Sequence, residues 1–122
     1  MVTGAGGFIG SHLVERLVQQ GAHTKAFIHY NSAGSWGHLD GSPYRDDMEM
    51  IAGDITDRDS IRAAMQGAGT VFHLAALIAI PYSYGAPSSY VRTNIVGTLN
   101  VLQSAMEIGV DQLIQTSSSE VY

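Results

Sequence analysis

At 122 residues the chain has the length of one domain and is long enough to bury a hydrophobic core. Hydrophobic residues make up 45% of it and charged residues 14%, a balance typical of folded proteins and not of disordered ones. The net charge of -5 argues against a nucleic-acid partner, because nucleic-acid-binding domains usually carry a basic stripe. The chain has no cysteine, which excludes disulfides and thiolate metal sites, and we expect no metal site.

Membrane insertion and secretion are also unsupported by the sequence. The longest apolar run, residues 71–80, contains His73 and is followed by Pro81, so it is too short to span a bilayer. No basic segment precedes an apolar signal-like stretch. We therefore expect a cytoplasmic protein with no membrane partner.

Strand-like apolar runs alternate with helical patterns along the chain, which is typical of βαβ units and a parallel sheet. Gly21 and Gly109 stand where two helices would end, and Asp57 stands where a third would begin. The pattern predicts strands at residues 1–3, 25–29, 48–52, 70–74 and 112–117, helices at 9–20, 58–65 and 88–108, and loops at 30–47 and 76–86. We expect one domain, residues 1–122, with an α/β fold: a doubly wound parallel sheet of order 3-2-1-4-5 with helices on both faces.

A glycine-rich turn lies between the first predicted strand and the first predicted helix. Glycines at spacing 1, 3, 6 are not present, because the last position falls on Ile9, whereas spacing 1, 4, 7 gives Gly4, Gly7 and Gly10. Glycine at such positions permits a tight turn, a close approach of phosphate to the backbone, and close packing of helix on sheet. A tight turn alone would look the same, but its place between strand and helix predicts a dinucleotide site, with the pyrophosphate over Gly7, Phe8 and Ile9.

The end of the second strand does not identify the dinucleotide. An NAD site usually has Asp or Glu there for the ribose 2′-hydroxyl, and an NADP site an arginine for the 2′-phosphate. Residues 28–32 contain neither. The expected cofactor is NAD or NADP, and the choice stays open.

Further segments resemble the extended short-chain dehydrogenase family, the NAD-dependent epimerases and dehydratases of nucleotide sugars. The matching segments are residues 53–57, 71–76 and 93–98. The resemblance implies a Rossmann-type fold, in which the Asp54-Ile55 pair touches the adenine and Asn94 braces the active-site strands. It also implies that the cofactor lies against the small residues at the end of the fourth strand, namely Leu74, Ala75 and Ala76. His73, in the same motif, is expected to be a core or loop histidine and not a catalytic one.

The segment after the fifth strand, residues 116–122, resembles the family's catalytic strand end. The resemblance places Ser118 at the sugar 4-hydroxyl, followed by Ser119 and Glu120 in the positions that 4,6-dehydratases use for catalysis. Epimerases generally lack this glutamate, which favours a dehydratase. The alternatives are a nucleotide-sugar epimerase, a UDP-glucuronate decarboxylase, whose class shares a similar run, and a non-catalytic dinucleotide-binding module.

A longer similarity points to a substrate. Residues 30–32, 35–40 and 77–84 resemble bacterial UDP-N-acetylglucosamine 4,6-dehydratases of legionaminic-acid-type pathways. The resemblance implies a UDP-sugar substrate and a homodimer in the full-length enzyme.

The family's catalytic tyrosine, followed four residues later by lysine, is absent, since Lys25 is the only lysine and Gly21 precedes it by four. We therefore expect residues 1–122 to be a partial NAD(P)-binding Rossmann domain, truncated before the C-terminal substrate-binding region and inactive by itself.

Overall fold

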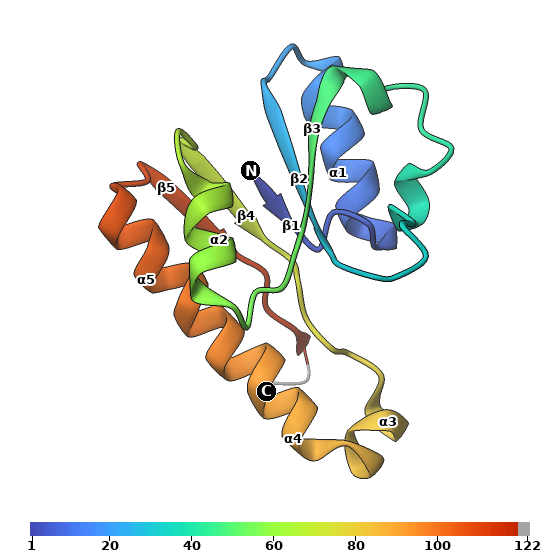
Figure 1. Ribbon diagram of the computed structural model, residues 1–122, viewed down its shortest axis with the longest axis vertical. Helices are drawn as coiled ribbons and strands as arrows, with labels where there is room; N and C mark the ends of the chain where they lie inside the picture. The colour runs from blue at the N-terminus through green and yellow to red at the C-terminus, as the bar shows by residue number, and fades with distance from the viewer. Residues whose placement is uncertain (120–122) are drawn as a thin grey trace.

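A parallel sheet of five strands forms the centre of the molecule (Figure 1). The structure is a computed structural model, and it describes residues 1–119. The strands are β1 Val2–Thr3, β2 Thr24–His29, β3 Met48–Gly53, β4 Thr70–His73 and β5 Gln112–Gln115. They are arranged in the order β3-β2-β1-β4-β5, and all four neighbouring pairs are parallel. The predicted fold class and strand order are confirmed.

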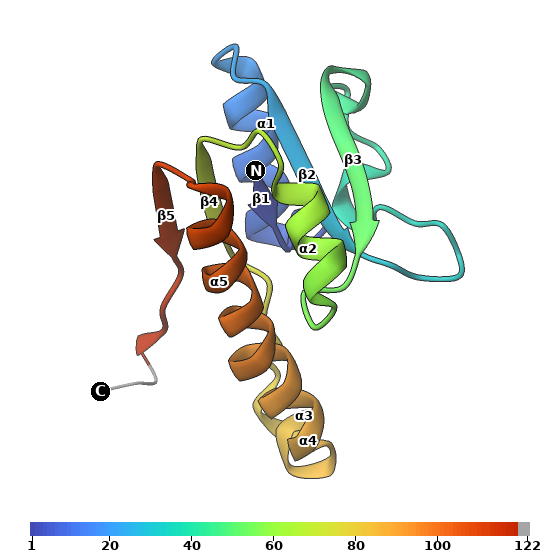
Figure 2. The same ribbon diagram turned by 60° about the vertical axis from the view of Figure 1, so that its left-hand side comes forward.

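Helices cover both faces of this sheet. Helix α1 packs on one face, and α2 and α5 pack together on the other, as Figure 2 shows. The helices are α1 Phe8–Gln19, α2 Arg58–Met65, α3 Ile80–Gly85, α4 Pro87–Tyr90, the π-helix η3 Val91–Gly97 and α5 Thr98–Ile108, with short 3-10 turns η1 Gly37–Leu39 and η2 Arg45–Asp47. In the described residues, no helix is long and apolar enough to cross a membrane.

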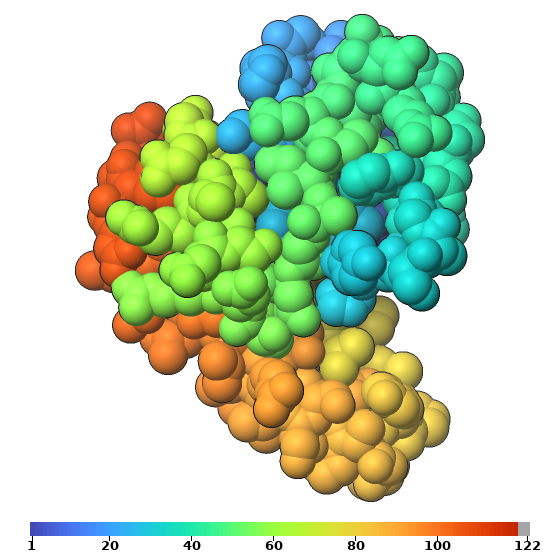
Figure 3. Space-filling model, viewed as in Figure 1, coloured from blue at the N-terminus to red at the C-terminus, as the bar shows by residue number. Residues whose placement is uncertain are grey.

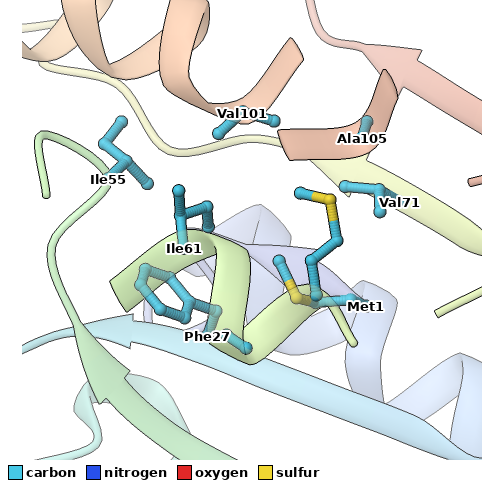
Figure 4. Packing of buried hydrophobic residues seen from close by; sticks show 9 residues of the cluster. Met1, Phe27, Ile55, Ile61, Val71, Val101 and Ala105 are labelled. Atoms are coloured by element: carbon cyan, nitrogen blue, oxygen red, sulfur yellow. The ribbon is translucent and has the colours of Figure 1, made fainter. Parts of the chain in front are cut away.

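Each face of the sheet has its own hydrophobic core, because successive strand residues point to opposite faces. On β2, Phe27 packs in the core under α2 and α5, whereas Ala26 and Ile28 pack in the core under α1. Figure 4 shows Ile61 of α2 and Val101 of α5 meeting in the first of these cores. Burial of each such large side chain contributes about 1.5–3 kcal/mol, so the two cores fix the strand order and the helix positions together.

The predicted helix ends are confirmed. Gly109 ends α5 with a φ of 76°, and Gly21 follows α1 with a φ of 80°, a left-handed conformation that glycine adopts at little cost. At the start of α2, the Asp57 carboxylate accepts hydrogen bonds from the N–H groups of Asp59 and Ser60.

Several predicted boundaries differ from the structure, most of them by one residue. The predicted loop 76–86 contains α3, whose Pro81 lies in the first helical turn, where its missing N–H costs nothing. The last helix begins at Pro87 and passes through the wider π-helical turns of η3 before α5. Strand β5 ends at Gln115, although the Thr116 N–H still donates to the His73 carbonyl at 3.2 Å.

In Figure 3 the yellow and orange segment that contains α3 and α4 projects from the lower end of the molecule.

Candidate dinucleotide site

The carboxyl ends of the five parallel strands lie at one edge of the sheet (Figure 1). In open α/β sheets, ligands bind at this edge. The predicted site residues belong to the segments that leave it after β1, β3, β4 and β5, or to the helix that follows β4. The fold therefore brings segments from distant parts of the chain to one edge.

The turn after β1 requires glycine at two positions. Gly4 has a φ of 69°, and a Cβ there would lie 2.8 Å from the backbone nitrogen of Ala75. A Cβ on Gly10 would lie 2.2 Å from the Gly4 carbonyl oxygen, far inside contact distance. Both glycines therefore let β1, α1 and the segment after β4 pack backbone against backbone.

Gly7 has a different role, because it faces solvent at the N-terminus of α1. It is the N-cap residue with an ordinary φ of -76°, and no side chain caps the helix. The next two side chains, Phe8 and Ile9, are each 68% exposed, and the first turn contains no acidic residue. The first-turn N–H groups have no partner within the helix, and with the helix dipole they favour an anion. A dinucleotide pyrophosphate fits this arrangement.

A network of hydrogen bonds around Thr3 and His73 lies beneath the glycine turn, between β1 and β4. Thr3 Oγ1 lies 2.7 Å from His73 Nδ1, and it also accepts hydrogen bonds from the N–H groups of Leu74 and Ala75, both at 3.2 Å. On the other side of the ring, His73 Nε2 lies 3.1 Å from Thr98 Oγ1. Because the Thr3 oxygen already accepts two hydrogen bonds, its own proton must go to Nδ1, so His73 is the neutral Nε2–H tautomer.

This network gives His73 a structural role. Its side chain is buried, and burial lowers the pKa of the imidazole below its ordinary value of 6.5. The ring joins β1, β4 and α5 at the edge where the glycine turn lies. Of the two expected placements, core or loop, the structure shows the core.

Folding stability should consequently fall as the pH drops below about 6.5. In that range the unfolded chain protonates His73 while the folded chain does not, so protons favour unfolding until the folded pKa is reached. The slope from this residue is at most about 1.4 kcal/mol per pH unit. Denaturant titrations between about pH 7.5 and pH 5.5 measure it. His73→Gln should flatten the slope and His23→Gln, an exposed control, should not; equal slopes in the parent and His73→Gln would contradict the assignment.

The segment after β3 is held by its own backbone and by α5. Asp54 Oδ1 accepts the Thr56 N–H at 2.8 Å, and Asp54 is half-buried. The Ile55 side chain is only 5% exposed and lies in the core, so a ligand contact with this residue would have to use its backbone. A Cβ on Gly97 would lie 2.6 Å from Ile55 Cδ1, so only glycine lets the helix approach this closely.

Asn100 is a site-supporting residue that the sequence reading missed. Its buried side-chain amide donates to the carbonyl oxygens of Ile55 and Thr56, at 3.0 and 3.1 Å. A lone polar residue on the apolar face of a predicted helix was the available signal. Asn100 therefore fixes the backbone of the segment that was predicted to face the adenine.

Asn94 lies in η3 and clamps the segment after β4. Its Oδ1 accepts the Leu77 N–H and its Nδ2 donates to the Leu77 carbonyl, both at 2.9 Å. Leu74 and Ala75 are half-buried and Ala76 is exposed, so this segment opens progressively from the core toward solvent. These hydrogen bonds hold the segment after β4, whereas the predicted role of Asn94 at the active-site strands stays a prediction.

Residues 116–119, the described part of the predicted catalytic segment, follow β5 at the same sheet edge. Ser118 and Ser119 are exposed. Glu120 lies outside the described residues. The roles of these three residues stay predictions.

Comparisons with known proteins identify the family. All of residues 1–122 match the family model for GDP-mannose 4,6 dehydratase. A 3 beta-hydroxysteroid dehydrogenase/Delta 5-->4-isomerase of Mycobacterium tuberculosis is 33% identical, over 99% of this chain and 32% of that protein. A UDP-N-acetyl-alpha-D-glucosaminuronate decarboxylase of Bacillus cytotoxicus is also 33% identical, over 100% of this chain and 37% of that protein.

The fold is also shared with a solved structure, that of MoeE5 in complex with UDP-glucose and NAD. It matches with a TM-score of 0.80 and 33% identity, over 99% of this chain and 36% of that one. The chain spans about a third of the length of the curated relatives it matches. With the fold, the glycine turn and the match along its whole length, the chain belongs to the GDP-mannose 4,6 dehydratase family, within the NAD-dependent epimerases and dehydratases.

Proposed function

We propose that this chain is the cofactor-binding part of an NAD(P)-dependent nucleotide-sugar 4,6-dehydratase. One observation carries the proposal: the glycine turn with its uncapped helix and the serines after β5 lie at the same edge of the sheet. A dinucleotide over Gly7 can therefore extend along this edge toward Ser118. The NAD in the solved MoeE5 complex supports a nicotinamide dinucleotide as the ligand.

The nicotinamide, when bound, would supply reversible hydride transfer. The chain's own residues would then do four things. The N–H groups after Gly7 bind the pyrophosphate, and Asn94 and the network of His73 hold the segment after β4 in place. Ser118 donates or accepts a hydrogen bond at the sugar 4-hydroxyl. Glu120 removes the C5 proton once C4 is a ketone, because the ketone makes that proton acidic enough for a carboxylate.

The full conversion removes one water from the sugar. Bound nicotinamide would accept the C4 hydride and later supply it to C6, and so would be regenerated in each turnover. Glu120 would take the C5 proton and pass it to the C6 hydroxyl, which leaves as water. The proton that the family's tyrosine takes from the 4-hydroxyl would be returned to C5, so that hydride and proton add across the C5–C6 double bond. We propose UDP-N-acetylglucosamine as the sugar nucleotide, on the resemblance of residues 77–84 to dehydratases that use it.

A decarboxylase is the second candidate. The Bacillus cytotoxicus relative carries that activity in its name, and the Ser118-Ser119-Glu120 run resembles both classes. A decarboxylase would oxidise C4 of a uronic acid in the same way and then lose carbon dioxide from C5 in place of water from C6.

The products distinguish the two reactions. An extended version of the chain that supplies the family's tyrosine and lysine is given UDP-N-acetylglucosamine or UDP-glucuronic acid, and the products are identified by mass spectrometry. The proposal expects a 4-keto-6-deoxy sugar from the first substrate. A 4-keto pentose from the second favours the decarboxylase. The 122-residue chain by itself is expected to bind cofactor without turnover.

The homodimer and the cytoplasmic location stay predictions. Apolar side chains are exposed along η3 and α5, among them Ile95, Leu99, Leu102 and Met106. Their helical spacing forms one stripe, which supports contact with another helix. Sedimentation of the full-length enzyme tests the dimer.

A further inference from the structure

A pocket of about 220 Å³ lies at the carboxyl ends of β2 and β3, beside the loop that follows β2. It is lined by Ile28, His29, Tyr30, Asn31, Gly34, Ser35, Trp36 and Ala52. In dinucleotide-binding sheets, the adenosine ribose lies at the end of the second strand, where an acid or an arginine reads its 2′ position. If the proposed function is right, this pocket is the place where NAD and NADP are distinguished.

The lining contains no group that would repel a 2′-phosphate. Among the described residues that line the pocket, none is Asp or Glu. Tyr30 occupies the first position after β2, its N–H donates to the Gly53 carbonyl at 3.0 Å, and its side chain is 66% exposed. A carboxylate at this position would bind a 2′-hydroxyl and repel a phosphate, whereas a phenol does neither strongly.

Two acids of adjoining segments, Asp40 and Asp54, are held by other partners. Asp40, in the same loop, accepts the Ser35 hydroxyl at 2.6 Å and the Trp36 N–H at 2.8 Å. The Ser35 hydrogen bond, followed by that of Trp36, keeps the pKa of this carboxyl below its ordinary value. Asp54 has one oxygen on the Thr56 N–H and the other 4.0 Å from Nδ1 of His29. Neither carboxylate is part of the pocket wall.

The lining also contains no group that would strongly prefer a 2′-phosphate. Among the described residues that line it there is no arginine or lysine, and the histidine among them, His29, has a side chain that is 77% exposed and lies 4.0 Å from Asp54. An arginine fork gives phosphate two parallel charge-assisted hydrogen bonds, and a single imidazole cannot.

We propose that this pocket accepts the adenosine ribose with or without a 2′-phosphate, so that the chain binds NAD and NADP with similar affinity. The proposal rests on the proposed function, because it concerns which dinucleotide the site takes. The dissociation constants for NAD and NADP should differ by less than about tenfold. A larger difference would need a negative charge that repels the 2′-phosphate or an arginine that binds it at two points, and the pocket lining has neither.

Calorimetric titration of the chain with NAD and with NADP tests this inference. Two dissociation constants within tenfold of each other support it, and a larger ratio in either direction overturns it while leaving the proposed cofactor site intact. If neither dinucleotide binds, both the inference and the proposed site are wrong.

Two substitutions test whether this pocket is the place of discrimination. Tyr30→Asp should weaken NADP binding by at least about tenfold and should not weaken NAD binding, because the new carboxylate repels a 2′-phosphate but can accept a hydrogen bond from the 2′-hydroxyl. His29→Arg should strengthen NADP binding alone. His23→Arg adds the same charge in the exposed turn before β2, at the opposite end of that strand, and should change neither. Unchanged affinity ratios in both test variants, with thermal unfolding as in the parent, would assign the ribose to another place and overturn the proposal.

Discussion

Gly7→Val should weaken dinucleotide binding by about 100-fold while the chain stays folded. The valine side chain would occupy the space over the first turn of α1, where the pyrophosphate is proposed to approach the backbone N–H groups. Losing one or two hydrogen bonds to a charged phosphate costs about 1.5–3 kcal/mol each, which corresponds to this factor. The backbone of Gly7 is ordinary, with a φ of -76°, and a Cβ there would meet only the Gly4 carbonyl, at 3.3 Å. Titration calorimetry with NAD and NADP measures the loss.

Gly10→Ala is the matched comparison, because it changes the other end of the same turn. Its Cβ would lie 2.2 Å from the Gly4 oxygen, so the backbone must move, and the substitution should lower the unfolding temperature. Gly7→Val should leave that temperature within a few degrees of the parent. If Gly7→Val kept full affinity for both dinucleotides, the pyrophosphate does not lie over this helix.

The strand order and most element ends could be predicted because they depend on local chemistry. The alternation of Ala26, Phe27 and Ile28 between two cores is a period of two, which identifies a strand buried on both faces. Gly109 and Asp57 identified their helix ends because a left-handed glycine and a capping carboxylate each act within a single helical turn. The spacing of Gly4 and Gly10 likewise reflects one tight turn, where each glycine avoids a specific backbone clash.

The contacts that position the site could not be predicted, since they join residues far apart in the chain. Gly37 approaches the turn so closely that a Cβ on it would lie 2.3 Å from the Gly6 oxygen, and the His38 N–H donates to the same oxygen. This contact folds the loop after β2 onto the glycine turn. Asn100 reaches the backbone at Ile55 across 45 residues. The sequence around each of these residues has no local pattern that identifies the distant residue it contacts.

Glu120→Gln should reduce the release of 4-keto-6-deoxy sugar by about 10² to 10⁴-fold in the extended, active enzyme, the range that a general base contributes. Glutamine is close in size and can still form hydrogen bonds, but it cannot accept the C5 proton. Oxidation at C4 does not need this carboxylate, so the variant should still form the 4-ketone and stop there. Absorbance of reduced nicotinamide and a 4-keto sugar trapped by borohydride are the expected signatures.

Glu107→Gln is the control for this experiment. Glu107 lies on α5 and pairs with Arg58 and Arg62 at the surface, so its loss removes a carboxylate without touching the proposed site. Such surface pairs contribute about 0–1 kcal/mol to stability, and turnover should be unchanged. If Glu120→Gln released product at the parent rate, Glu120 would not be the C5 base, and the dehydratase proposal would lose its main support from an individual residue. If the extended parent enzyme released a 4-keto pentose from UDP-glucuronic acid and left UDP-N-acetylglucosamine unchanged, the decarboxylase proposal would replace the dehydratase proposal.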